Sequence, residues 1–247
     1  MNLQDVATVF WRDWLVLDRK LIKFVLSRMI SPILYLVAFG WGVGRGGSVA
    51  GGSYLDFIVP GIMAMNAMNI SFSAVGSPLN MSRLYHKTLE EYLIAPMDMG
   101  SFVAGKILAG SLRGLISCSV IFLIAYMFGA RFLVDVWFLL ALALTCLLFA
   151  ALGLVAGMLT ETHEAMGNFT TYVLLPMSFL CATFFSLEKL PYIVQILIEI
   201  MPLTHATYCL RSIGSGGGVP WISLGVLIFY TGTFALAGMA TMKTVRD

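Results

Sequence analysis

The chain has 247 residues, of which 59% are hydrophobic and 11% are charged, and its formal net charge is +2. An average soluble domain has roughly 45–50% apolar and about 25% charged residues, so this composition excludes a water-soluble globule, and the low net charge excludes nucleic acid as a partner. At about 20 apolar residues per spanning helix, we expect six spans with short connections and no large soluble domain.

Residues 1–28 are predicted to form an amphipathic helix that lies at the membrane interface. Apolar residues from Val6 to Val25 recur at three- and four-residue steps, and charged residues fill the positions between them. Trp11 and Trp14 lie at the border of the apolar face, where a helix in the membrane plane favours aromatic residues. The polar, charged start does not resemble a cleavable signal.

Residues 29–247 are predicted to form one all-α, six-helix transmembrane domain. The apolar runs place the spans at about 29–44, 55–77, 102–128, 132–159, 165–185 and 221–242. A polar segment, 80–100, separates the second and third spans. In the segment 186–219, the apolar run Ile193–Met201 is too short to cross and lies between Pro191 and Pro202, which favours a re-entrant or interfacial helix.

The positions of Lys and Arg indicate the orientation, since cytoplasmic loops carry an excess of them. If the N-terminus is cytoplasmic, the inner side holds Arg12, Arg19, Lys20, Lys23, Arg28, Arg83, Lys87, Lys106, Lys243 and Arg246. The outer side holds only Arg45, Arg131, Lys189 and Arg211. We therefore expect both termini in the cytoplasm and the segment 186–219 outside.

Polar residues within the expected spans are candidates for a substrate cavity. Asn66 and Asn69 lie three apart beside Met65, on one helical face of the second span. Hydrogen bonding between helices is the favoured interpretation of such amides, and substrate contact is the alternative. Arg113 in the third span either faces a wet cavity or extends to the interface. Asn168 and Thr171, at the start of the fifth span, are further candidates for this cavity.

Other patterns favour packing over chemistry. Gly110/Gly114 and Gly153/Gly157 have the spacing that lets helices approach closely. The cysteines are spread out, without a paired motif, and are interpreted as packing residues; a disulfide between Cys181 and Cys209 remains a weak alternative. The run Gly100–Lys106 lacks the Ser or Thr that completes a phosphate-binding loop, and the three histidines lie apart, so no nucleotide, metal or catalytic site is expected.

The segment Arg83–Pro96 is the strongest functional candidate. Built as a helix, it places Leu89, Tyr92 and Leu93 on one side and mostly charged residues on the other, with a proline at its end. This pattern predicts a short docking helix, with one face against the bundle and the other offered to a cytoplasmic protein.

Five stretches of the sequence resemble the membrane subunit of ABC-2 type transporters, above all the bacterial permeases of the nodulation-factor and daunorubicin-exporter kind. They are Tyr54–Gly61, Tyr85–Pro96, Glu161–Asn168, Phe184–Pro191 and Met201–His205. Together with the amphipathic entry helix, the resemblance covers nearly all of the chain.

This resemblance implies a homodimer of six-span permease subunits in the bacterial inner membrane, above two separate ATP-binding subunits that hold ATP and Mg²⁺. This chain itself would carry no cofactor. The 4–23 helix would be a connecting helix, and residues 187–211 would cap the exit. Coupling to the ATP-binding subunit would fall to Tyr85, His86, Lys87, Glu90, Glu91, Glu161 and His163.

The expected activity is outward transport by alternating access, driven by the partner's ATP hydrolysis. Because the spans hold few polar groups, a two-fold seam between subunits would form a mostly apolar cavity, which favours an amphipathic or lipid-linked cargo such as a glycolipid, a polysaccharide or a drug. Two alternatives remain. An intramembrane enzyme or lipid-handling protein without ATP coupling needs catalytic groups clustered at one depth. A secondary carrier needs buried acids.

Overall fold

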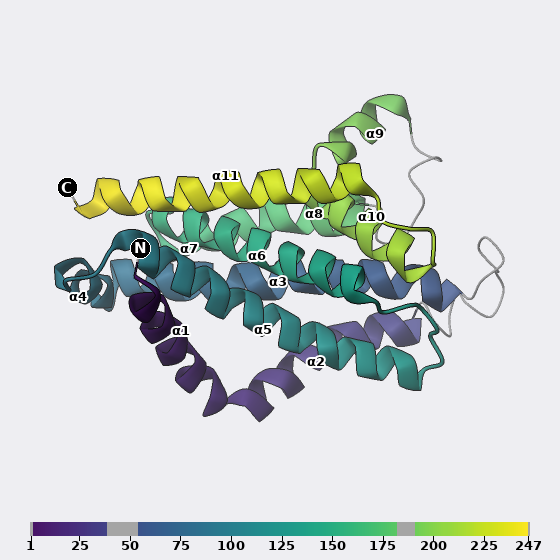
Figure 1. Ribbon diagram of the computed structural model, residues 1–247, viewed down its shortest axis with the longest axis horizontal. Helices are drawn as coiled ribbons and strands as arrows, with labels where there is room; N and C mark the ends of the chain where they lie inside the picture. Colours follow the sequence, from purple (N-terminus) through teal and green to yellow (C-terminus); the bar gives the residue numbers. More distant parts are fainter. Residues whose placement is uncertain (1, 39–53, 182–190, 247) are drawn as a thin grey trace.

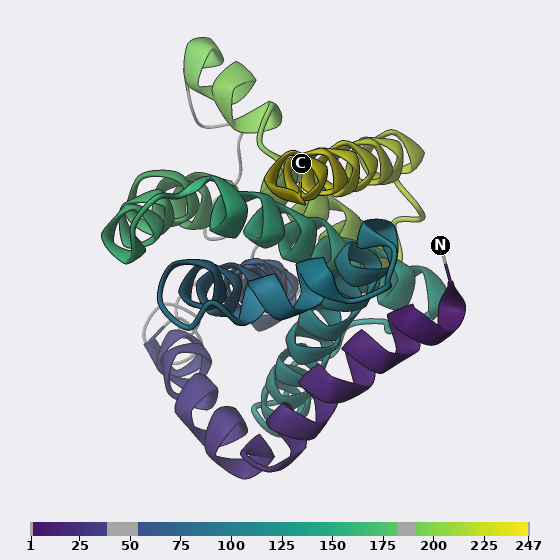
Figure 2. The same ribbon diagram turned by 90° about the vertical axis from the view of Figure 1, so that its left-hand side faces the viewer.

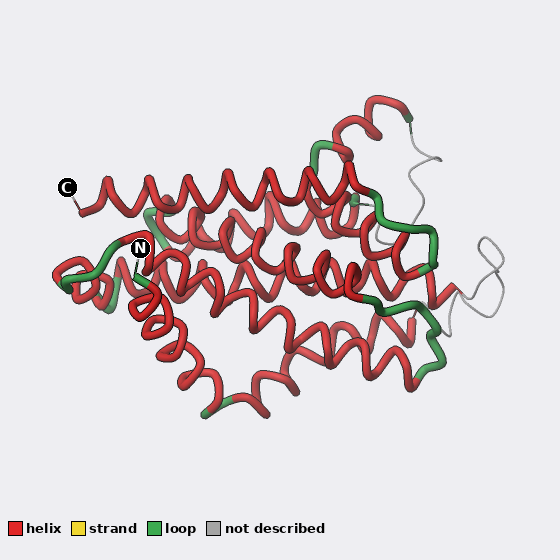
Figure 3. Tube along the Cα trace, viewed as in Figure 1, coloured by secondary structure: helices red, strands yellow, loops and turns green. Residues whose placement is uncertain are grey.

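The computed structural model describes residues 2–38, 54–181 and 191–246, and every regular element in these ranges is helical (Figures 1 and 3). The longest helices lie side by side along the long axis of the molecule (Figure 1). Both chain ends lie at one end of this bundle, together with α4 (Figure 1). We call it the terminal end, and the opposite end, where α5 connects to α6, the far end.

Within the described ranges, four helices are long and apolar enough to cross a membrane: α3 (Tyr54–Leu84), α5 (Met99–Met127), α6 (Val136–Leu159) and α11 (Trp221–Arg246). They correspond to the second, third, fourth and sixth expected spans. The helix α3 continues past Ser77, where the sequence predicted a polar connection, and includes Pro78. The prediction of several membrane-crossing helices is therefore confirmed, although the boundary after the second span was placed too early.

The two other expected spans coincide with shorter helices. The helix α2 (Leu21–Val37) begins before the predicted start at Met29. The fifth span corresponds to three consecutive pieces, α7 (His163–Phe169), the π-helical turn η2 (Thr170–Leu174) and α8 (Leu175–Leu180). The rest of both expected spans, 39–44 and 182–185, lies outside the described residues.

The sequence predicted one continuous amphipathic helix over residues 1–28, but the structure contains two helices there. The helix α1 (Leu3–Asp18) ends at a turn formed by Arg19 and Lys20, and α2 begins directly after it. The helix α1 packs along α5, with Val9 buried and Trp11 exposed. Viewed from the terminal end, α1 and α2 form a V on the outside of the bundle (Figure 2).

The packing of α3 against α6 and α5 defines the core. Gly153 of α6 lies against the backbone of Phe72 in α3, and a Cβ atom there would approach the Phe72 carbonyl oxygen to 2.5 Å. One turn later, a Cβ on Gly157 would lie 2.6 Å from the carbonyl oxygen of Gly76. On the α5 side, Gly110 and Gly114 allow similarly close contact with α3. The interpretation of both glycine pairs as packing sites is confirmed, because only glycine leaves room for such an approach.

Two helices lie at the far end, where the apolar run Ile193–Met201 predicted one short helix and the family resemblance implied outer re-entrant helices. The helices α9 (Tyr192–Glu199) and α10 (Pro202–Gly214) meet at an angle of 88°. The apolar face of α10 is buried in the bundle, whereas α9 projects from it with Tyr192 and Ile193 exposed (Figure 2). The turn between them falls at Met201, where Pro202 begins the second helix, because proline suits the first turn of a helix.

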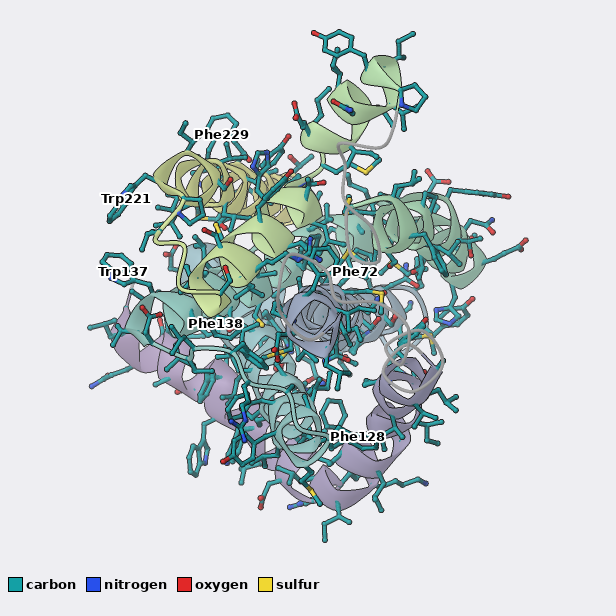
Figure 4. The ribbon with its side chains drawn as sticks, turned by 90° about the vertical axis from the view of Figure 1, so that its right-hand side faces the viewer. Phe72, Phe128, Trp137, Phe138, Trp221 and Phe229 are labelled. Carbon is teal, nitrogen blue, oxygen red and sulfur yellow. The ribbon has the colours of Figure 1, made fainter. Side chains whose placement is uncertain are left out.

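Large aromatic residues divide between the core and the outside of the bundle (Figure 4). Phe72 and Phe138 are 1% exposed, whereas Trp221 is 64% exposed. The rings of Trp137 and Trp221 pack edge to face at 5.1 Å near the far end. Paired tryptophans at this level are typical of a membrane–water boundary.

Candidate functional site

The terminal end carries the residues that the sequence assigned to coupling, and all of them are exposed. They lie on two neighbouring segments: the turn and helix that follow α3, and the turn that joins α6 to α7 together with the first residue of α7. We call this set the docking surface, and its members are Tyr85, His86, Lys87, Glu90, Glu91, Glu161 and His163.

The predicted docking helix is shorter than expected. The structure forms α4 only over Thr88–Ile94, so Tyr85 and His86 belong to a turn and not to the helix. Lys87 ends this turn in a left-handed conformation, with φ of 52°. The hydroxyl groups of Ser82 and Thr88 lie 2.5 Å apart across the turn and share a hydrogen bond. The helix ends before Pro96, as predicted, because proline disfavours a helical conformation in the residue before it.

The inner face of α4 packs against two other helices. Leu89 is 2% exposed, and the Tyr92 ring centroid lies 4.8 Å from that of Phe102 in α5. The guanidinium carbon of Arg12 in α1 lies 5.0 Å from the Tyr92 centroid, within cation–π range. The predicted two-sided helix is therefore confirmed for Leu89 and Tyr92, and a displacement of α4 would act directly on α1 and α5.

Hydrogen bonds from the end of α3 hold the two halves of the docking surface together. The side-chain amide of Asn80 donates to the carbonyl oxygen and to the hydroxyl of Thr160, at 3.1 and 3.0 Å. The guanidinium of Arg83 donates to the same carbonyl at 2.5 Å and to the carbonyl of Met158. The last carbonyls of a helix have no partner within the helix, so a cation bound to them stabilises the C-terminus of α6. This link was not predicted from the sequence, although a cation near a helix end was a signal for it.

Four of the predicted cavity residues line one groove between α2, α3, η2 and α8. We call it the lateral groove; its volume is about 440 Å³, and it is lined in part by Met65, Asn66, Asn69 and Thr171. Among the residues that the structure describes, the lining is uncharged, and it includes the hydroxyl-bearing residues Ser27, Ser31, Tyr35, Ser73, Thr170 and Ser178. A volume and lining of this kind suit a ligand that is partly apolar and makes a few hydrogen bonds.

The two asparagines of the groove differ in their partners. The amide of Asn66 donates to the Ser117 hydroxyl of α5 at 2.9 Å, so it joins two helices. The amide of Asn69 donates to the Met65 carbonyl, one turn earlier in its own helix. The favoured interpretation, a hydrogen bond between helices, therefore holds for Asn66, whereas among the described residues Asn69 bonds only within its own helix.

The structure places the remaining two predicted cavity residues elsewhere. Arg113 lies on the side of α5 that faces α1, where its guanidinium donates to the Asp13 carbonyl at 3.2 Å. Asn168 is exposed on α7 and does not line the groove. Sequence alone grouped these residues by approximate depth, but depth does not determine which side of a helix a residue occupies.

The wall formed by η2 and α8 contains a feature that the sequence analysis missed. The π-helical turn Thr170–Leu174 precedes Pro176, which lies in the first turn of α8. A proline has no N–H group and collides with the carbonyl four residues earlier, and the wider π turn absorbs this conflict. Pro176 was the available signal. Turns of this type are frequent at functional sites.

The cysteines are packing residues, as predicted. All four are buried and free, so the alternative of a disulfide between Cys181 and Cys209 is not realised. The Cys181 sulfur instead lies 3.5 Å from the sulfur of Met201.

The comparisons with known proteins agree with this arrangement. Residues 4–214 match the family model described as "ABC-2 type transporter". The chain belongs to the ABC-2 type transporter family. It is 30% identical to the inner membrane transport permease YadH of Escherichia coli K12. This similarity extends over 232 residues, which are 92% of this chain and 87% of YadH. It is 28% identical to nodulation protein J of Rhizobium leguminosarum bv. viciae, over 90% of this chain and 87% of that protein.

Membership in the ABC-2 family identifies the chain as a permease subunit of an ABC transporter. The match to the family model covers α1 through α10, and thus both the docking surface and the lateral groove. The resemblance inferred from sequence motifs is therefore confirmed.

Proposed function

We propose that this ABC-2 permease exports an amphipathic or lipid-linked molecule across a bacterial inner membrane, driven by a separate ATP-binding subunit. In this proposal α2 and the α7–η2–α8 segment complete six spans, and the terminal end faces the cytoplasm. The observation that carries the proposal is the docking surface, whose exposed charged residues are tied to the bundle by buried contacts on α4 and by hydrogen bonds from α3. The name of YadH, which places that relative in the inner membrane, supports the location.

The docking surface has the properties that a coupling element requires. Its outer residues include the three carboxylates of Glu90, Glu91 and Glu161, and Lys87 is its one lysine. Its charge is therefore mainly negative. Such a surface favours a partner with a basic patch. Movement of the partner would reach α1 and α5 through Tyr92, and α6 through Arg83. ATP can shift the permease between two states only if the partner binds those states with unequal affinity.

The coupling assignment is tested by reversing charge on the docking surface. In the double variant Glu90→Lys/Glu91→Lys, we expect a co-expressed ATP-binding subunit to be lost from the affinity-purified complex, while membrane insertion is unchanged. The matched control is Glu199→Lys, which reverses an exposed carboxylate on α9 at the far end. Retention of the ATP-binding subunit and of ATP-driven transport in the double variant would remove the coupling role of α4.

The lateral groove supports the proposed class of cargo. Its described lining combines aliphatic and aromatic walls with hydroxyl and amide groups. No charged side chain is among the lining residues that the structure describes, which suits an acyl chain joined to an uncharged polar head. We expect the ATPase activity of the assembled complex to rise when neutral amphiphiles are added. An ATPase that ignores every amphiphile and responds to simple ions would contradict this substrate class.

A second copy of the chain is proposed to complete the pathway. The helices α2 and α8 both contribute to the groove, and Ile30 and Leu34 of α2 and Leu175 and Phe179 of α8 are at least half exposed. A two-fold pair that joins these helices would enclose both grooves in one cavity. Native mass spectrometry of the purified complex should give two permeases and two ATP-binding subunits; a single permease in an active complex would refute the homodimer.

A carrier or a lipid-handling protein without ATP coupling is the other candidate. The acids near the span ends do not favour a carrier: the Asp56 carboxylate accepts from the Arg131 backbone N–H at 2.6 Å, and Asp135 caps α6. Transport by the purified chain alone, with no ATP-binding subunit present, would nevertheless establish this alternative.

A further inference from the structure

A second pocket, distinct from the lateral groove, lies between α1, α3, α4 and α5 on the inner side of the docking helix. Its volume is about 320 Å³. The side chains of Arg12, Lys106 and Arg113 line it, together with the single carboxylate of Asp13 and with Tyr92. We call it the basic pocket. Its described lining has three cationic side chains and one carboxylate, histidine aside, and thus an excess of two positive charges.

The cations of the pocket are unequally satisfied. The Lys106 ammonium donates to both carboxylate oxygens of Asp13, at 2.9 and 2.8 Å, and so uses the only acid in the lining. Arg113 donates one hydrogen bond, to a backbone carbonyl. No described residue accepts a hydrogen bond from the Arg12 guanidinium, which lies over the Tyr92 ring. Two guanidinium groups with five N–H donors each therefore retain most of their capacity.

The pocket lies near the membrane boundary of the terminal end. The helix α5 has 29 residues, which gives a length of about 43 Å at 1.5 Å per residue, longer than the hydrocarbon core of roughly 30 Å. If the far end of α5 reaches one boundary at Met127, the other boundary falls about 20 residues earlier, near Leu108. Lys106 and Arg113, two turns apart on one face, then lie on either side of this boundary, where arginine and lysine heads meet lipid phosphates.

The remaining lining of the pocket is largely apolar, with Ser82, His86 and Thr88 as its other polar residues. Val16, Ala74, Val75 and Pro78 contribute to its lining. Val16 is 56% exposed on α1, so the apolar side continues onto the outer surface of that helix. A phosphate with an attached glycerol and acyl chain would use both the cations and this wall, whereas a free phosphate would use the cations alone.

We propose that the basic pocket binds the phosphate group of an anionic lipid from the leaflet at the terminal end. Arg12 and Arg113 hold the phosphate oxygens, since planar guanidinium groups match them in paired hydrogen bonds. Lys106 remains paired with Asp13 and contributes to the positive field. Because Arg12 belongs to α1 and stacks on Tyr92 of α4, the bound lipid joins α1 to the docking helix.

Lipid titration of the full-length chain in neutral detergent, followed by native mass spectrometry, tests this proposal. The probes are phosphatidylglycerol and phosphatidylcholine with the same acyl chains, and inorganic phosphate alone. We expect the wild-type chain to prefer phosphatidylglycerol. The variant Arg12→Gln/Arg113→Gln should lose about 30-fold in affinity for it, or about fivefold per charge. The matched control Arg131→Gln, an exposed arginine at the far end, should bind as the wild type does.

Two further variants keep the test decisive. Arg12→Lys/Arg113→Lys retains both charges and should recover most of the affinity. If the double glutamine variant does not fold, Arg12→Gln alone serves as the test, because no described residue accepts a hydrogen bond from the Arg12 guanidinium. This variant should lose about fivefold in affinity for phosphatidylglycerol. Equal binding of the two lipids by the wild type, or an equal loss in Arg131→Gln, would overturn the proposal. If the wild type binds inorganic phosphate but not phosphatidylglycerol, the pocket is a site for a soluble phosphate, and the lipid is excluded.

Discussion

The contact between α3 and α6 should depend on the absence of side chains at Gly153 and Gly157. Alanine at these positions would place Cβ atoms 2.5 and 2.6 Å from backbone carbonyl oxygens of α3. Ordinary contact requires about 3.5 Å, so the two helices must separate by about 1 Å. Overpacking of this kind costs about 1–3 kcal/mol per site, whereas the helix propensity of alanine returns at most about 1 kcal/mol per site.

The matched control removes the propensity effect from this comparison. A Cβ on Gly225 or Gly232 of α11 would meet no atom within 4 Å, so Gly225→Ala/Gly232→Ala gains the same propensity without the clash. Gly153→Ala/Gly157→Ala should therefore be less stable than the control by at least about 2 kcal/mol, or about 4–8 °C in melting temperature.

Tryptophan fluorescence during heating of the detergent-solubilised chain measures both variants under the same conditions. If the two variants melt within about 1 °C of each other, the close α3–α6 approach does not limit stability, and the packing argument fails. A lower melting temperature for the control than for the wild type would show that α11 also needs its glycines for a contact outside this chain.

Three other substitutions or reactions test particular contacts. Lys106→Met leaves the carboxylate of Asp13 unpaired and should lower the free energy of unfolding by about 1–3 kcal/mol. This is below the about 3–5 kcal/mol typical of a fully buried pair, because these side chains are 16% and 20% exposed. Asp13→Asn/Lys106→Met should recover most of this stability in the same melting assay. Asn66→Leu removes the bond to Ser117 and should destabilise the chain by about 0.6–1.7 kcal/mol; an unchanged melting temperature would show that this bond is replaced. The four cysteines are free and buried, so a maleimide should label none in the native chain and all four after denaturation without reductant; rapid native labelling or an incomplete denatured count would contradict the structure.

The local features that the sequence predicted correctly are those that depend on nearby residues. Apolar runs identified α5, α6 and α11, because a helix in lipid must be apolar along about 20 residues. Proline positions located the end of α4 and the start of α10, since proline removes a donor and restricts the residue before it. The family resemblance followed from similarly local motifs.

The errors occurred where a distant partner decides the structure. Asn80 and Arg83 belong to α3, and not to a loop, because Thr160 and Met158 at the end of α6 accept their hydrogen bonds. The single N-terminal helix is divided at Arg19 because α1 follows α5 while α2 turns along the bundle.

The sequence by itself determined that this protein is an all-helical membrane permease, and it also selected the residues of the docking surface, which are exposed at the terminal end. Only the tertiary structure separated Arg113 from the lateral groove and brought it to Arg12 and Lys106 in the basic pocket. The physical reason is that helical periodicity gives the relative angle of residues on one helix, whereas the neighbour that each face meets depends on how all the helices pack together.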